Sequence, residues 1–210
     1  PDFEILLIGY KFDDEDDVTV MDIHGLGKAG AMDSIEMLCP NFWDSLTDPE
    51  VIKTAFNANF ERTALAKYFD TPMPPEQWRC TMVHASMLGL PRSLADVGEA
   101  LGLPQDKQKD KIGKSLIDYF CKPCKPTKKN GGRTRNLPEH DEEKWNLFIE
   151  YNQQDVVAEQ AILNKIRIYP VPESEQELWD FDQRMNDRGI KLDWDFIGQF
   201  QVASPTGSVD

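Results

Sequence analysis

The sequence FNANFER, residues 56–62, lies between a short apolar segment at 51–56 and a segment at 60–69 with apolar residues at helical spacing. This pattern predicts a strand that passes directly into a helix. Side chains at such a junction emerge at the edge of an α/β sheet, which is where ligands commonly bind. The junction is therefore the first place in the chain to look for a site.

Three side chains of this run have suitable chemistry. Asn57 could hydrogen-bond a nucleotide backbone, and Phe60 could present an aromatic face to a base. Glu61 could hold a divalent cation through its carboxylate oxygens. A capping asparagine, a core phenylalanine and a surface glutamate explain the same letters without any function, so the run by itself decides nothing.

A second pair of residues stands in the sequence YNQQD, residues 151–155. Tyr151 and Asp155 are four positions apart in a long helical segment, so both lie on one helix face. A carboxylate is a hard oxygen ligand for Mg²⁺ or Mn²⁺, and a neighbouring tyrosine hydroxyl can orient a water molecule. An interfacial tyrosine beside a solvated aspartate is the alternative reading of this isolated pair.

The remaining periodicity predicts an α/β chain. Strands are expected at 5–12 and 18–23, as an antiparallel pair, and helices at 81–88, 93–101 and 141–168. A long polar loop is expected at 121–139, and prolines break the chain at 169–172. A last helix at 173–187 should end at Gly189. We place a domain boundary at the break, between 1–168 and 169–210.

Composition narrows the class of protein. The chain has 210 residues, 40% of them hydrophobic, and no run of roughly 18 apolar residues that could span a membrane. With no signal peptide at its start, we expect a cytoplasmic protein without a membrane partner. The four cysteines are too few and too irregular for a disulfide framework.

The charge is uneven along the chain. The net charge of −14 excludes a uniformly basic surface, whereas the segment at 107–135 carries ten lysines and arginines against two aspartates. Such a run is usually a solvated loop, and in a DNA-processing protein it is equally able to touch nucleic acid. The sequence leaves both readings open.

The two motifs together resemble a known superfamily. FNANFER, followed about 90 residues later by YNQQD, resembles the second and third motifs of the DEDD nucleases, N-x-x-[FY]-D and Y-x-x-x-D. EQWRCTMVHA at 76–85 and KPCKPTKKNGGRTRNLPEH at 122–140 resemble phage-type family A DNA polymerases, and MNDRGIKLD at 185–193 resembles the start of their polymerase portion. The resemblance is to the proofreading 3′→5′ exonuclease region of such polymerases and implies a ribonuclease H-like mixed sheet flanked by helices.

The resemblance also implies a mechanism and partners. Two Mg²⁺ or Mn²⁺ ions would hydrolyse the 3′-terminal phosphodiester of DNA, with Asp155 and Glu61 as metal ligands and Tyr151 orienting the water. Asn57, Phe60 and Arg92 would contact the single-stranded 3′ end. The rest of the polymerase chain would be the other partner. Glu61 departs from the family pattern, which has aspartate at this position.

The first motif of the superfamily, D-x-E on the opening strand, is not matched. Asp2 and Glu4 spell D-x-E, but the strand that should follow after a hairpin begins immediately, so we interpret them as a chance match. The genuine pair and the first strand would then lie upstream. We therefore expect a fragment without nuclease activity of its own, with an exposed sheet edge that favours self-association.

Four other interpretations of the same residues compete with this one. The domain could be a non-catalytic module that binds single-stranded DNA or braces the polymerase, or a stand-alone RNA exonuclease, which 185–193 disfavours. Cys121 and Cys124 form a C-x-x-C pair that could bind zinc, although no second pair follows. Gly113, Lys114 and Ser115 imitate the end of a phosphate-binding loop, but Gln108 stands where its first glycine is required.

Overall fold

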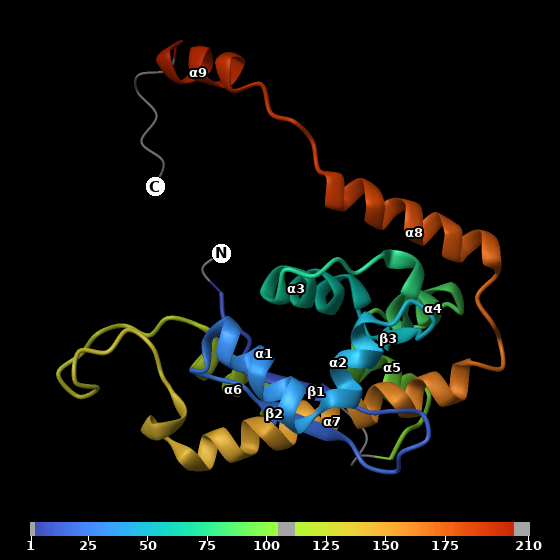
Figure 1. Ribbon diagram of the computed structural model, residues 1–210, viewed down its shortest axis with the longest axis horizontal. Helices are drawn as coiled ribbons and strands as arrows, with labels where there is room; N and C mark the ends of the chain where they lie inside the picture. The colour runs from blue at the N-terminus through green and yellow to red at the C-terminus, as the bar shows by residue number, and fades with distance from the viewer. Residues whose placement is uncertain (1–2, 105–111, 204–210) are drawn as a thin grey trace.

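The computed structural model describes residues 3–104 and 112–203 and contains two small sheets (Figure 1). β1 (Leu7–Tyr10) and β2 (Thr19–Asp22) pair antiparallel, with Leu7 opposite Asp22. β3 (Lys53–Ala55) and β4 (Trp78–Cys80) pair parallel. The predicted antiparallel pair and the strand before FNANFER are confirmed.

Helices make up most of the remaining structure. Five of them follow predicted segments or the FNANFER junction, and their bounds are α3 (Ala58–Phe69), α4 (Thr81–Met87), α5 (Leu94–Ala100), α7 (Glu142–Ile166) and α8 (Glu173–Arg188). The short 3₁₀ turn η3 (Pro138–His140), at the end of the expected polar loop, was not predicted. Gly189 has φ 65° after α8, which is the left-handed conformation expected of a helix-ending glycine.

Several elements were not predicted from the sequence. They are α1 (Gly27–Leu38), α2 (Pro40–Thr47), the 3₁₀ turn η1 (Pro75–Gln77), the strand β4, α6 (Gly113–Cys121) and α9 (Trp194–Ala203). β4 has three residues, too few to show an alternating pattern. Among the α1 side chains that the structure describes, Ala31 and Ile35 alone are almost completely buried, so the apolar face is too narrow to produce a clear helical period.

α7 is the element that joins the two sheets (Figure 1). It packs against β1 at Gly9, where an added Cβ would lie 2.4 Å from Oδ1 of Asn152. Seven residues further along, Glu159 accepts a hydrogen bond from the backbone of Phe56, immediately after β3. A side chain at position 9 would meet the Asn152 side chain, which would have to shift to accommodate it.

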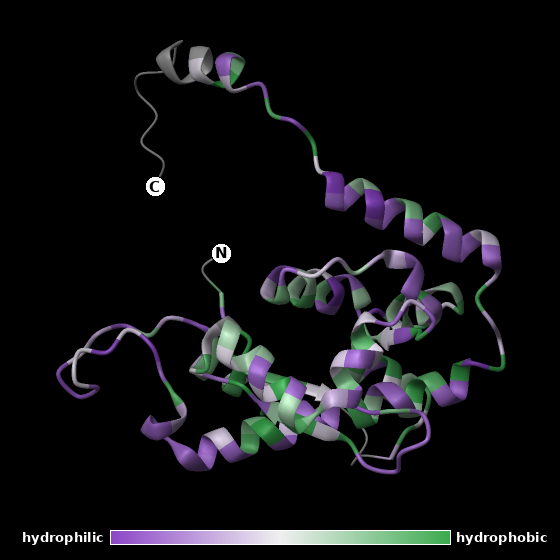
Figure 2. Cartoon of the chain, viewed as in Figure 1, coloured by the Kyte–Doolittle hydropathy of each residue, from purple (hydrophilic) through white to green (hydrophobic). Residues whose placement is uncertain are grey.

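The largest hydrophobic core lies between the two sheets and α1, α2 and α3, with Ile8, Met21, Ala55 and Trp78 among its buried members. Trp179 of α8 packs against the edge of this core. Apolar residues accordingly gather in the body, whereas α8 and the loop between α6 and α7 are mostly hydrophilic (Figure 2). No helix in the described part of the chain combines the length and apolar character needed to cross a membrane.

The fold is of the mixed α/β kind, but the described strands form two separate pairs and not one mixed sheet. The ribonuclease H-like arrangement therefore stays a prediction. The first part of the basic segment, at 107–111, and Asp2 of the D-x-E pair lie outside the described residues.

Candidate active site

The FNANFER run forms a tight entry into α3. Asn57 adopts the left-handed conformation, with φ 73° and ψ 47°, and places Ala58 in the core without exposure to solvent. Asparagine is one of the few non-glycine residues that adopt this conformation readily. The sharp turn sends consecutive side chains of the run in different directions.

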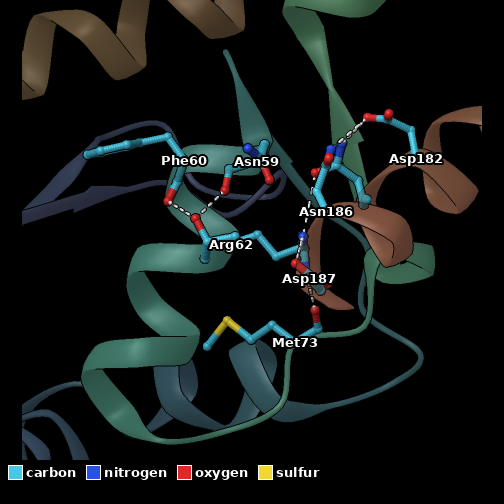
Figure 3. A network of polar contacts seen from close by, with 9 residues as sticks. Asn59, Phe60, Arg62, Met73, Asp182, Asn186 and Asp187 are labelled. Carbon is cyan, nitrogen blue, oxygen red and sulfur yellow. Dashed lines mark hydrogen bonds and ion pairs between the residues drawn. The ribbon is translucent and has the colours of Figure 1, made fainter. Parts of the chain in front are cut away.

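Phe60 and Arg62 show this divergence. The Phe60 side chain is 65% exposed and its ring points away from the Arg62 guanidinium (Figure 3). An exposed aromatic ring at the start of a helix is available to stack on a base. The prediction that Phe60 contacts a base is thus compatible with its placement and stays a prediction.

Arg62 points inward and is 3% exposed. Its guanidinium makes two parallel bonds to Asp187 of α8, Nη1 to Oδ2 at 2.8 Å and Nη2 to Oδ1 at 2.7 Å (Figure 3). Nη1 also donates to the carbonyl of Met73 at 3.2 Å. The pairing is the bidentate arrangement that makes arginine–carboxylate contacts strong, and it ties the FNANFER helix to α8.

Glu61, between Phe60 and Arg62, is the first candidate metal ligand. Its Oε2 atom is buried and accepts no hydrogen bond from the described residues. Loss of hydration raises the pKa of Glu61 to about 7, and repulsion from Glu159 adds to the increase. A carboxylate placed in this way is poorly satisfied by its surroundings.

Glu159 of α7 was not identified from the sequence. Its Oε1 accepts a hydrogen bond from the Thr81 hydroxyl at 2.9 Å, and its carboxylate also accepts one from the Phe56 backbone. Desolvation raises the pKa of Glu159 to about 7 against these two hydrogen bonds, and Asp155 raises it further. Glu159 follows Asp155 by four residues, as Asp155 follows Tyr151, so all three lie on one face of the helix. This spacing is the sequence signal that could have identified Glu159.

Tyr151 and Asp155 lie on successive turns of α7, as their spacing predicts. Tyr151 is 4% exposed, and its ring packs against Gly113 at the start of α6, where an added Cβ would lie 1.9 Å from Cε2. The glycine that imitates a phosphate-binding loop in the sequence is thus a packing partner of the tyrosine ring. Any larger residue there would displace the ring or the helix.

The structure brings carboxylates of the two distant motifs to a common neighbour. Glu159 interacts electrostatically with Glu61 of α3 and with Asp155 of α7. Arg92 lies exposed in the segment between α4 and α5, and its contact with a 3′ end stays a prediction. Glu4 is directed elsewhere, because its two oxygens bind the Gly25 backbone and Arg135.

The chemistry of these oxygens suits a hard divalent cation. Nevertheless, within residues 3–104 and 112–203 no three His, Cys, Asp or Glu side chains are arranged to hold a metal ion. Cation binding here therefore needs further oxygen ligands. Cys121 and Cys124 of the C-x-x-C pair belong to no such group among these residues. The Cys124 Sγ atom donates a hydrogen bond to the Arg133 carbonyl.

Comparison with known proteins yields one informative similarity. The chain is similar to a DNA polymerase of Bacillus phage SP02, with 53% identity over 197 residues. The aligned region covers 94% of this chain and 28% of that polymerase, so the chain spans less than a third of its relative. No protein-family model and no solved structure matches the chain.

Proposed function

We propose that this chain is a 3′→5′ exonuclease-like segment of a DNA polymerase and takes part in hydrolysis of the 3′-terminal phosphodiester of DNA. The observation that carries the proposal is that Glu159 lies close enough to interact with both Glu61 and Asp155, although their motifs are about 90 residues apart in sequence. The similarity to a phage DNA polymerase supports the polymerase part of this proposal.

In this proposal the chain mainly positions charge. Asp155 and Glu61 contribute carboxylate oxygens for Mg²⁺ or Mn²⁺, which when bound would supply charge stabilisation at the attacking and leaving oxygens. Tyr151, held by its contact with Gly113, orients the attacking water. Asn57 and Phe60 grip the unpaired 3′ end, with Arg92 as a phosphate contact.

The fold supports this assignment indirectly. An isolated two-stranded sheet is marginal by itself, yet the structure contains an antiparallel pair and a parallel pair held by the same helix, α7. We infer that one further strand joins the two pairs into a single mixed sheet flanked by helices. We infer a ribonuclease H-like arrangement on this ground.

A non-catalytic module is the second candidate, and one observation favours it. Desolvation raises the pKa of Glu61 and of Glu159 to about 7, and a carboxyl group that holds its proton more tightly binds a cation less readily. In this case the segment would bind single-stranded DNA or brace the rest of the polymerase.

The two candidates differ in their response to Asp155→Ala. In a polymerase that carries this segment, we expect Asp155→Ala to nearly abolish 3′→5′ excision, because a metal ligand is lost, while Tyr151→Phe slows excision less. Polymerisation should largely survive in both variants. Excision and synthesis are measured on the same primer–template.

Unchanged excision in Asp155→Ala would exclude Asp155 from the site and favour the non-catalytic module. Equal loss of excision and synthesis would instead indicate misfolding, which a thermal melt of the variant would detect. Glu150→Ala, an exposed glutamate on the same helix, is the matched control and should leave both activities intact.

A further inference from the structure

We propose that the loop at residues 122–137, between α6 and α7, binds the phosphate backbone of single-stranded DNA. The loop contains Lys122, Lys125, Lys128, Lys129, Arg133 and Arg135 and no acidic residue, in a chain whose net charge is −14. Local cation density of this kind attracts polyanions even on an acidic protein. In Figure 1 the loop projects from the body, beyond the end of α7.

No ion pair among the described residues neutralises the charges at the tip of the loop. Lys122 pairs with Asp118 at 2.6 Å and Arg135 pairs with Glu4 at 2.6 Å, which fixes the two ends of the loop. Lys125, Lys128, Lys129 and Arg133 make no ion pair within the described part of the chain. These four side chains form the free basic tip.

The tip is held in shape by amides and not by carboxylates. Asn130 accepts hydrogen bonds from the backbone of Thr127 and Gly132 through Oδ1, and Nδ2 donates to the carbonyls of Lys125 and Arg133. Gly131 and Gly132 have φ values of 70° and 78°, which complete the turn. These hydrogen bonds order the backbone of the tip without neutralising its lysine and arginine side chains.

Arg133 is positioned by the same chemistry. Its Nε donates to Oδ1 of Asn136 at 2.8 Å, and its Nη1 donates to the Asn130 carbonyl at 3.3 Å. Asn136 is buried and donates in turn to the Tyr119 carbonyl of α6 at 2.9 Å. The guanidinium is therefore preorganised by neutral partners, which lowers the entropy lost when it binds a phosphate.

The position of the loop relative to Tyr151 sets its place on a DNA strand. α6 starts at Gly113, against the Tyr151 ring, and reaches the loop eight residues later, or about 12 Å along the helix. The route along α7 from Tyr151 to Glu142 is nine residues, or about 13.5 Å. At about 3.4 Å per nucleotide of stacked strand, the base of the loop lies about four nucleotides from the terminal phosphodiester, and its tip meets phosphates at that distance or beyond.

The distance in nucleotides between the loop and the terminal phosphodiester rests on the proposed function, whereas DNA binding by the loop does not. The test therefore measures binding without cleavage, by fluorescence anisotropy of a labelled oligothymidylate about 12 nucleotides long in EDTA. The loop variant is Lys125→Gln, Lys128→Gln, Lys129→Gln in this 210-residue chain. The control removes the same charge from exposed lysines elsewhere, as Lys67→Gln, Lys165→Gln, Lys191→Gln.

We expect the loop variant to flatten the slope of log Kobs against log [salt] by about 2, since each lost contact with a single strand contributes about 0.7. The affinity ratio of wild type to variant should then fall about 16-fold between about 50 and 200 mM salt. The control should bind as the wild type does. On a trinucleotide, loop variant and wild type should differ much less.

An unchanged slope, an equal effect of the control or absence of binding by the wild-type chain would overturn the proposal. Tighter binding of duplex DNA or RNA of the same length would overturn the choice of ligand. Asp155→Ala separates the two proposals, because it should retain oligonucleotide binding while excision is lost in the polymerase. Excision that survives in Asp155→Ala would therefore reject the proposed function and leave the loop proposal standing.

Discussion

At the scale of single residues, Glu159 is the group that connects the two motifs, and its environment disfavours ionisation. The folded chain holds its proton up to about pH 7, whereas the reference pKa is 4.5. Between these values the folded state binds more protons than the unfolded state, so stability falls as the pH rises. The contribution is complete below pH 4.5 and is lost as the pH passes 7.

We therefore expect Glu159→Gln to flatten this pH dependence. Glutamine retains an oxygen that accepts the Thr81 hydroxyl but cannot ionise. Wild type should lose about 2–3 kcal/mol of unfolding free energy between about pH 5 and 8 that the variant does not lose. Urea unfolding at several pH values measures this loss of unfolding free energy. As a control, Glu150→Gln changes an exposed residue of α7 and should behave as wild type.

Asn57 allows a conformational role to be separated from a binding role. Its left-handed backbone is tolerated by glycine but strains alanine. We expect Asn57→Ala to lose about 1 kcal/mol of stability and Asn57→Gly to lose much less. If the Asn57 side chain also contacts DNA, Asn57→Ala and Asn57→Gly should weaken oligonucleotide binding equally. If binding is weakened by Asn57→Ala but not by Asn57→Gly, as stability is, Asn57 acts only through its backbone conformation.

At the scale of elements, the contact between α3 and α8 is the clearest long-range connection. Arg62 of α3 is almost fully buried, while Asp187 of α8 remains 40% exposed in its side chain. Gln176 of α8 adds a hydrogen bond to the Trp78 carbonyl of β4 at 3.2 Å. α8 therefore packs on the body, although the sequence places it beyond the expected domain boundary.

Asp187→Asn should destabilise the chain by about 2 kcal/mol. The substitution leaves the Arg62 charge buried without its counter-ion, and the exposure of Asp187 reduces the cost below that of a fully buried pair. Proteolysis at 169–172 should accelerate as α8 detaches. Asp118→Asn removes the exposed pair with Lys122 and should leave the melting temperature unchanged; similar effects of both variants would contradict the role of burial.

At the scale of the whole molecule, the described residues do not complete a metal site. Divalent cations need several oxygen ligands, and Glu61 with Asp155 supplies too few. We expect the isolated chain to show little or no metal-dependent release of nucleotides from 3′-labelled single-stranded DNA. Robust release in Mg²⁺ or Mn²⁺ that is absent from an Asp155→Ala control would show that the ligand set in this chain suffices.

The two-stranded sheets have a consequence for assembly. Strands in such small sheets leave backbone groups at their edges that can pair with another chain. We expect the purified chain to self-associate with increasing concentration, as measured by sedimentation velocity. A monomer at every concentration would indicate that the strand edges are covered.

Local sequence was sufficient to predict the antiparallel strand pair, the strand before FNANFER and the common helix face of Tyr151 and Asp155. These features depend on side-chain alternation and helical spacing, which act between residues close in sequence. Short or narrowly amphipathic elements such as β4 and α1 produce too little of this signal. They were therefore found only in the structure.

Only the tertiary structure decided which distant side chains meet. The hydrogen bond from Thr81 to Glu159, the pairing of Arg62 with Asp187 and the packing of Gly113 on Tyr151 each join elements that are far apart in the chain. No local period encodes them, because they arise from how helices and strands pack in three dimensions. The sequence thus determined the chemistry carried by each motif, and packing determined the neighbours and protonation of its carboxylates.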